Sequence, residues 1–247
     1  RSVGSRRADR SPGIGVGLRM ASTGTLTLEF WREADKLLAS KPKAIDADEL
    51  EKLFPEWVAS IGQDSLDHSR MWVTYAAAHF VEGALTPQSR VLEYGAGGST
   101  LFFAQHVGEL VTVEHDRDWL QRTAARVNWR PNFKWVPRLC EPEPRSASDR
   151  PPDPADPLAY ATSDARYGDA SFRKYASAID EFPYGYFDVV LVDGRSRPAC
   201  FMHAAGRVAV GGHVILDNAE RDTYAFVERF AERMGFHVRE FWGPGPY

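Results

Sequence analysis

Hydrophobic and polar residues alternate in blocks along most of this chain. From residue 90 onward, short apolar runs are separated by segments in which apolar residues recur at helical spacing. The run VVLV at 189–192 is apolar at every position, as in strands covered on both faces. This alternation predicts a doubly wound α/β fold with a mostly parallel sheet and right-handed crossovers. We expect its strands at 90–95, 109–114, 133–139, 186–193, 212–218 and 236–242. We expect the helices between them at 99–107, 117–128, 171–182, 198–208 and 221–234.

The part of the chain before the first expected strand has a different pattern. Helical spacing of apolar residues predicts three helices in the region 23–88, at 26–40, 46–62 and 68–85. Residues 1–22 are rich in Arg, Ser and Gly and nearly free of acidic residues. We interpret 1–22 as a disordered leader and 23–247 as a single domain.

The segment 141–169 interrupts the regular alternation. It is dense in Pro, Ser and Asp and is longer than a usual connection between a strand and a helix. We expect a flexible insertion or a lid, with its rear half ordered by aromatic residues such as Tyr160 and Tyr167.

Composition limits the classes of partner. The chain has 247 residues, of which 43% are hydrophobic, enough for one sizeable α/β domain. A net charge of -4 does not favour a nucleic-acid backbone as partner. Cys140 and Cys200 form neither a disulfide framework nor a zinc pattern, which favours the cytoplasm. No apolar run approaches the roughly 20 residues of a membrane span, so we expect no membrane contact.

A glycine-rich turn follows the first expected strand. The stretch EYGAGGST begins at Glu93, and an acidic residue, Glu114, ends the next expected strand. Glycines let backbone amides approach a nucleotide, and an acid at that second position can accept both ribose hydroxyls. A dinucleotide turn would carry a further glycine where this chain has Thr100. Glu93 would also sit badly beside a pyrophosphate, whereas it suits a cofactor with a positive charge and an amino group.

The E-x-G-x-G pattern resembles the first motif of the class I S-adenosylmethionine (SAM) methyltransferases, which have a Rossmann-like fold. The resemblance implies that Glu93 lies near the methionine end of the cofactor and that Glu114 binds its ribose. The cofactor-binding residues predicted in this way are Glu93, Gly95, Ala96, Gly97, Ser99, Glu114 and His115. Ser99 departs from the glycine of many family members and could cap the helix instead. For His115, an exposed loop position is the alternative to a place beside the adenine.

The family resemblance also raises a question about the end of the chain. In this class an antiparallel strand normally completes the sheet after the sixth strand. Here only GPGPY follows the strand expected at 236–242. We therefore expect the last antiparallel strand to be missing or the chain to be truncated.

Three polar residues follow the fourth and fifth expected strands of the sheet. Asp193 ends FDVVLVD, and Asp217 and Asn218 end HVILDN. Carboxylate and amide oxygens from neighbouring strand ends suit Mg²⁺. The trio resembles the metal site of the catechol and caffeoyl-CoA O-methyltransferases, and the resemblance implies Asp193, Asp217 and Asn218 as metal ligands. A bound cation would lower the pKa of an acceptor hydroxyl.

The residues after Asp193 depart from that pattern. Those families place a lysine there as general base, whereas this chain has Gly194, Arg195, Ser196 and Arg197. Arginine stays protonated and is a poor base, but it binds carboxylates and phosphates well. We predict Asp193 and Arg195 as catalytic residues, with either a metal alone activating the acceptor or an anionic substrate.

The resemblance predicts a SAM-dependent methyltransferase that methylates oxygen of a small molecule, as a monomer or homodimer. Several alternatives stay open. Asp-Asn after a strand also makes a turn or a helix cap, and the enzyme would then be a metal-free N- or carboxyl-methyltransferase. An aminopropyltransferase shares the sheet and the acid, but its cationic substrate would be repelled by Arg195 and Arg197. A non-catalytic binding module, or a turn without a ligand, is the remaining alternative.

Overall fold

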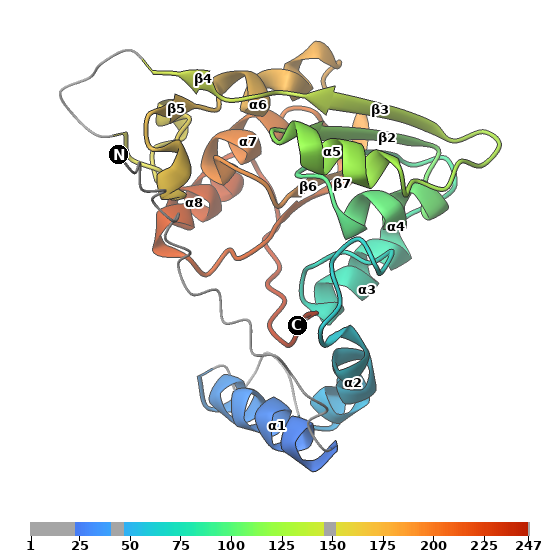
Figure 1. The fold of residues 1–247 in the computed structure, drawn as a ribbon. Coiled ribbons are helices and arrows are strands. Elements are labelled where there is room, and N and C mark those ends of the chain that lie inside the picture. The colour runs from blue at the N-terminus through green and yellow to red at the C-terminus, as the bar shows by residue number, and fades with distance from the viewer. Residues whose placement is uncertain (1–22, 41–46, 146–151, 247) are drawn as a thin grey trace, which may run out of the picture.

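The computed structural model describes residues 23–40, 47–145 and 152–246. Within these residues a five-stranded sheet has the order β3-β2-β1-β6-β7, and every neighbouring pair in it is parallel (Figure 1). The fold is therefore the doubly wound α/β fold predicted from the sequence. The strands of the sheet are β1 (Arg90–Tyr94), β2 (Glu109–Glu114), β3 (Lys134–Leu139), β6 (Phe187–Val192) and β7 (Val208–Leu216).

Side chains that alternate along β1 enter two separate hydrophobic layers. Val91 packs with α3 and α4 on one face, whereas Leu92 and Tyr94 pack with α6 and α7 on the other. The first face is covered by α3 (Tyr75–Ala84), α4 (Gly98–His106) and α5 (Arg117–Ala124). The second is covered by α6 (Arg173–Ser177), η3 (Ala178–Glu181) and α7 (Arg197–Ala204), with η4 (Asp222–Tyr224) and α8 (Ala225–Arg233) beyond α7.

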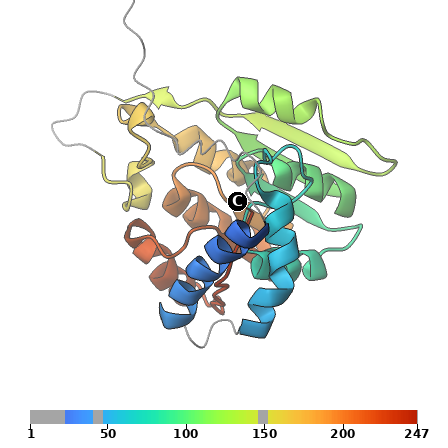
Figure 2. The ribbon, with the colours of Figure 1, turned by 60° about the horizontal axis from the view of Figure 1, so that its bottom comes forward.

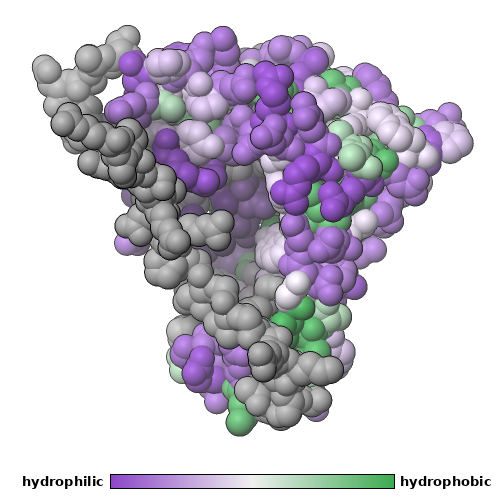
Figure 3. Space-filling model, in the orientation of Figure 1, coloured by the Kyte–Doolittle hydropathy of each residue, from purple (hydrophilic) through white to green (hydrophobic). Residues whose placement is uncertain are grey.

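Two further helices, α1 (Thr23–Ser40) and α2 (Ala47–Ser60), lie at one end of the molecule (Figure 1) and form a pair, seen from that end in Figure 2. They have their own small core, in which Phe30, Leu50 and Trp57 are buried. Hydrophilic side chains dominate the face seen in Figure 3, and hydrophobic ones gather lower down, over the region of α2 and α3. None of the helices that the structure describes is both long and apolar enough to cross a membrane.

The strand predicted at 236–242 is not formed, and this prediction is wrong. Instead, Phe241 packs on Phe80 of α3 with ring centroids 5.1 Å apart. The chain then crosses to the start of α3, where the amide of Tyr75 donates a hydrogen bond of 2.9 Å to the carbonyl of Pro244. Within the described residues, β7 consequently has no strand on its outer edge.

Other boundaries also differ from the predicted ones. The helix predicted at 68–85 begins only at Tyr75, because residues 61–74 form an irregular segment, which we call the connecting segment. The helix predicted at 171–182 is divided into α6 and η3. β7 begins four residues before the predicted 212 and pairs with β6 through an irregular register.

The described rear part of the predicted insertion, 152–169, packs against the second face. It contains η1 (Pro157–Ala159) and η2 (Ala165–Tyr167), and Tyr160 contributes to the hydrophobic core beside α7. A short antiparallel pair, β4 (Glu143–Pro144) with β5 (Ala170–Ser171), closes the base of the insertion. The predicted leader 1–22 lies outside the described residues, and so do residues 146–151 of the insertion.

Candidate functional site

The glycine-rich turn between β1 and α4 lies between two other parts of the chain. Gly95 has a φ of 99°, which favours glycine, and a side chain there would lie 3.2 Å from the Cα of Gly194 at the end of β6. A methyl group on Gly98 would collide with the carbonyl oxygens of Ser65 and Arg70. The turn is thus held between the end of β6 and the connecting segment.

Glu93 lies beneath this turn and is fully buried. Its carboxylate accepts hydrogen bonds from the hydroxyls of Ser99 and Thr100, both at 2.5 Å, and from Thr112 at 2.8 Å. Burial raises the pKa of Glu93 to about 7, although the three hydroxyls oppose this change. Glu93 therefore supports the turn from below, and Ser99 is bonded to Glu93 within α4 instead of capping the helix.

Glu114, at the end of β2, reaches back to the turn. Its Oε2 accepts a hydrogen bond of 2.8 Å from the amide of Ala96, and its Oε1 accepts from the amides of His115 and Asp116. Burial acts to raise the pKa of Glu114, but contact with the His115 ring and these amides together lower it. The carboxylate therefore fixes the position of the turn through the Ala96 amide.

A cavity of about 430 Å³ opens above the turn. Five consecutive residues, 95–99, line it together with Asp193 from the end of β6. The connecting segment supplies the remaining wall through Asp64, Ser65 and Trp72. The charged side chains of this lining, Asp64 and Asp193, are both acidic. Each is paired with an arginine, and the described lining has no basic side chain to receive a pyrophosphate.

The structure therefore brings together five of the predicted residues, namely Gly95, Ala96, Gly97, Ser99 and Asp193. Glu93 and Glu114 lie behind the turn instead of in the cavity wall. Asp64 and Ser65 were not predicted, because they occupy an irregular segment with no motif around them. Trp72 is an aromatic residue whose position the sequence pattern assigned to a helix, and the structure places it in the irregular segment.

His115 and Arg195 anchor the insertion. The ring of His115 is 11% exposed and packs against Tyr167 and Phe172, with centroids 5.3 and 5.7 Å away. Arg195 pairs with Asp164 at 3.1 Å, and its Nε lies 3.4 Å from Nε2 of His115. Neither side chain lines the cavity. Their predicted roles in cofactor binding and catalysis have no support from these contacts.

The predicted metal ligands converge on an arginine. Ser196 adopts a left-handed conformation, with φ 49°, and Arg197 then turns back beneath the strand ends. Its guanidinium lies 2.8 Å from the carboxylate of Asp193 and 3.1 Å from that of Asp217. It also donates to the carbonyl oxygens of Asp193, Gly194 and Asp217.

This arrangement does not fit Mg²⁺, because a guanidinium already lies between the two carboxylates. Asn218 turns its amide oxygen to two arginines, Arg197 at 3.4 Å and Arg221 at 2.6 Å. No group of three or more His, Cys, Asp or Glu side chains in the described part of the chain could hold a metal ion. Burial raises the pKa of Asp193, Arg197 opposes this, and the nearby Asp217 reinforces it.

No protein-family model matches the chain, and no curated protein sequence matches it. Similar solved structures include a methyltransferase-like protein from Silicibacter pomeroyi, 25% identical over 57% of this chain and 69% of that one, with a TM-score of 0.41. The YcgJ protein from Bacillus subtilis is 14% identical over 57% of this chain and 49% of its own, with a TM-score of 0.34. A TehB-like SAM-dependent methyltransferase from Corynebacterium glutamicum is 12% identical over 74% of this chain and 81% of that one, with a TM-score of 0.39. Because every TM-score is below 0.5, the functional assignment depends on the site itself.

Proposed function

We propose that this protein is a SAM-dependent methyltransferase that transfers a methyl group to oxygen of a small molecule without a metal ion. The observation that carries the proposal is the cavity above the glycine-rich turn, whose described lining has no basic side chain and whose turn Glu114 supports from behind. Its volume of about 430 Å³ lies within the usual range of about 300–1,000 Å³ for small-molecule sites.

Each part of the site has a role toward this cofactor. The turn at 95–99 brings backbone close to the ligand, and Glu114 holds this turn in place through the Ala96 amide. Asp64 provides carboxylate oxygens in the cavity wall that can accept hydrogen bonds from the amino group. SAM supplies a methyl group on a positively charged sulfur, and the residues around the cavity orient the acceptor toward it.

The proposed reaction uses no metal ion, because the Arg197 guanidinium occupies the position between Asp193 and Asp217 where the ion was expected. A guanidinium that bridges Asp193 and Asp217 fixes the carboxylate of Asp193 at the cavity wall. It stays protonated at every pH at which the protein folds, so it supplies a constant positive charge. Asp193 is therefore expected to contribute through its fixed position in the cavity wall.

Isothermal titration calorimetry with S-adenosylhomocysteine tests the proposal. We expect binding by the wild-type chain and a loss of roughly tenfold or more in Glu114→Ala, about 1.4 kcal/mol or more. Glu109→Ala is the matched control, because Glu109 lies on the same strand and pairs instead with Lys134 and Tyr186. Absence of binding to the folded wild-type chain would contradict the proposed function. Turnover of labelled SAM with hydroxylated small molecules, unchanged by EDTA, would support the metal-free reaction.

A further inference from the structure

Trp72 is the aromatic side chain in the wall of the proposed cofactor cavity. The other described residues of the lining are the turn 95–99, Ser65 and the two acids Asp64 and Asp193. Trp72 is partly exposed, so its ring is accessible from the cavity. An indole ring carries partial negative charge on its faces and stabilises a cation placed over it. The ring is therefore a candidate contact for a positively charged part of the ligand.

The two acids of the described lining are already paired with arginines. The carboxylate of Asp64 lies 3.4 Å from the Arg122 guanidinium, and that of Asp193 lies 2.8 Å from Arg197. A permanent positive charge beside each acid offsets the attraction of that acid for a cation. A neutral aromatic ring attracts a cation without needing a free carboxylate, which makes Trp72 the better placed of the three side chains for this role.

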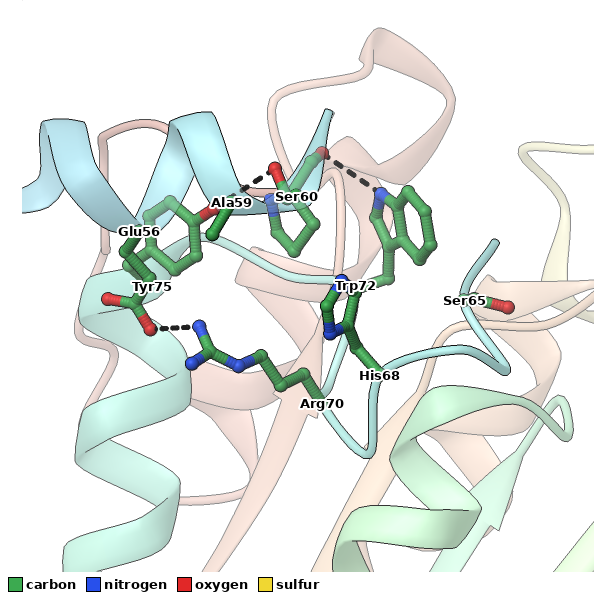
Figure 4. Close-up of a pocket in the computed structure, with 9 residues that line it drawn as sticks. Glu56, Ala59, Ser60, Ser65, His68, Arg70, Trp72 and Tyr75 are labelled. Carbon is green, nitrogen blue, oxygen red and sulfur yellow. Dashed lines mark hydrogen bonds and ion pairs between the residues drawn. The ribbon is translucent and has the colours of Figure 1, made fainter. Parts of the chain in front are cut away.

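The segment 244–246 holds the Trp72 ring in a fixed orientation. The indole N–H donates a hydrogen bond of 3.0 Å to the Pro246 carbonyl, shown as a dashed line in Figure 4. A methyl group on Gly245 would lie only 2.8 Å from the carbonyl oxygen of Val73, so the two backbones are in direct contact. The ring is therefore oriented before a ligand binds, and little side-chain entropy is lost on binding.

The ring of Trp72 extends toward the glycine-rich turn. Trp72 and Ser65 line the cofactor cavity and also a smaller cavity of about 40 Å³ beside His68, so the ring lies between these two spaces. In Figure 4 the indole N–H points to the Pro246 carbonyl, and the six-membered ring extends on the side of Ser65. That is the side of the turn, since a Cβ on Gly97 would lie 3.6 Å from the Ser65 hydroxyl.

We propose that the indole ring of Trp72 contacts the sulfonium of SAM and favours this charged cofactor over its neutral product. The inference rests on the proposed methyltransferase function and adds a residue to the same site. In the reaction the acceptor oxygen forms a bond to the methyl carbon and releases its proton to water. The carbon–sulfur bond breaks, and its electron pair stays on sulfur, which becomes a neutral thioether. The ring then loses its cation–π interaction, so the spent cofactor is held less tightly than fresh SAM.

The contact is tested on the full wild-type chain by NMR with SAM that carries ¹³C in its methyl group. The ring current of an indole moves the resonance of protons held over its face upfield, so we expect an upfield shift of the methyl protons on binding. In Trp72→Leu we expect this shift to be lost. Trp129→Leu is the matched control, because Trp129 is 63% exposed and does not line the cavity. A methyl resonance that binding to the wild-type chain leaves unshifted would overturn the proposal.

Calorimetry separates the charge of the ligand from its shape. SAM and sinefungin, in which a carbon bearing an ammonium group replaces the methylated sulfur, are cationic at this position, whereas S-adenosylhomocysteine is neutral there. In Trp72→Leu we expect the Kd of both cationic ligands to rise roughly fivefold more than that of S-adenosylhomocysteine. Trp72→Phe, which keeps an aromatic ring, should retain part of the preference.

Equal losses for all three ligands would also overturn the proposal, because Trp72 would then contact a neutral part of the cofactor. The wild-type methyl resonance decides the matter even if Trp72→Leu does not fold. Failure of both SAM and S-adenosylhomocysteine to bind the folded wild-type chain would instead refute the methyltransferase function. The two failures are therefore distinguishable.

Discussion

The guanidinium of Arg197 lies 2.8 Å from the carboxylate of Asp193, in a position between two strand ends where a cation was expected. The side chain of Arg197 is only 10% exposed, and its second carboxylate partner is Asp217. The pattern of acids at the ends of β6 and β7 is thus explained by an internal ion pair.

Removing this arginine should destabilise the fold. Arg197→Met leaves two partly buried carboxylates without their counter-ion, and we expect the free energy of unfolding to fall by about 3 kcal/mol. Arg138→Met should change it by less than about 1 kcal/mol, because the pair of Arg138 with Glu181 is exposed. Urea denaturation followed by circular dichroism measures both values. A similar small change in the two variants would contradict the structural role of Arg197.

The buried acid beneath the turn should make stability depend on pH. Since the pKa of Glu93 is raised to about 7, the folded state binds its proton more tightly than the unfolded state does. The resulting stability is complete below the unfolded pKa of about 4.5 and is lost as the pH rises toward 7. Its full size is of the order of 3 kcal/mol. Glu93→Gln, which cannot ionise, should therefore gain stability relative to wild type between pH 5 and pH 8. Parallel unfolding curves for the two proteins across this range would show that Glu93 titrates normally.

Gly98 should tolerate no side chain. Gly98→Ala forces a methyl group against the carbonyl oxygens of Ser65 and Arg70, and we expect a loss of about 1–3 kcal/mol together with weaker binding of S-adenosylhomocysteine. Gly83→Ala in α3 is the opposite case, because an added methyl group there meets nothing within 4 Å. It should stabilise the protein by about 0.5–1 kcal/mol. Thermal unfolding and calorimetry distinguish these outcomes, and wild-type behaviour of Gly98→Ala would refute the close contact.

The ion pair between Arg195 and Asp164 should hold the insertion in place. The pKa of Asp164 is lowered to about 2, first by the hydrogen bond from the Arg166 side chain and also by Arg195. The stabilisation that ionised Asp164 provides is therefore lost only as the pH falls from about 4 toward 2. At neutral pH, Arg195→Gln should speed proteolytic cleavage within 152–169 roughly threefold to tenfold. Lys174→Gln, which breaks an exposed pair with Glu143, is the control. Cleavage at equal rates would mean that the aromatic contacts alone secure the insertion.

Local sequence patterns predict the strands of the sheet, but they do not predict the course of the segments packed around it. The apolar run 189–192 predicts a strand because both of its faces are covered, and all five strands of the sheet overlap the ranges expected from the sequence. The segment 236–242 also contains apolar residues, but its Phe241 packs on Phe80, and the segment does not pair with β7. Only the tertiary contact distinguishes the two outcomes.

The residues of the site are likewise predicted only in part by local sequence patterns. The glycine-rich turn and its acids follow a local motif, and the turn and Asp193 line one cavity in the structure. The role of Arg197 depends on the left-handed backbone at Ser196, which no local spacing indicates. His68 and Asp64 likewise reach the cavities through an irregular segment whose course is determined by packing on Gly98.

The contact between Gly95 and Gly194 links the two halves of the sheet at their carboxyl ends. A Cβ on Gly95 would lie 3.2 Å from the Cα of Gly194, and one on Gly194 would collide with the Tyr175 hydroxyl. There is no slack between the turn and the end of β6. Glycine at both positions is therefore what allows the turn and the end of β6, two walls of one cavity, to approach each other so closely.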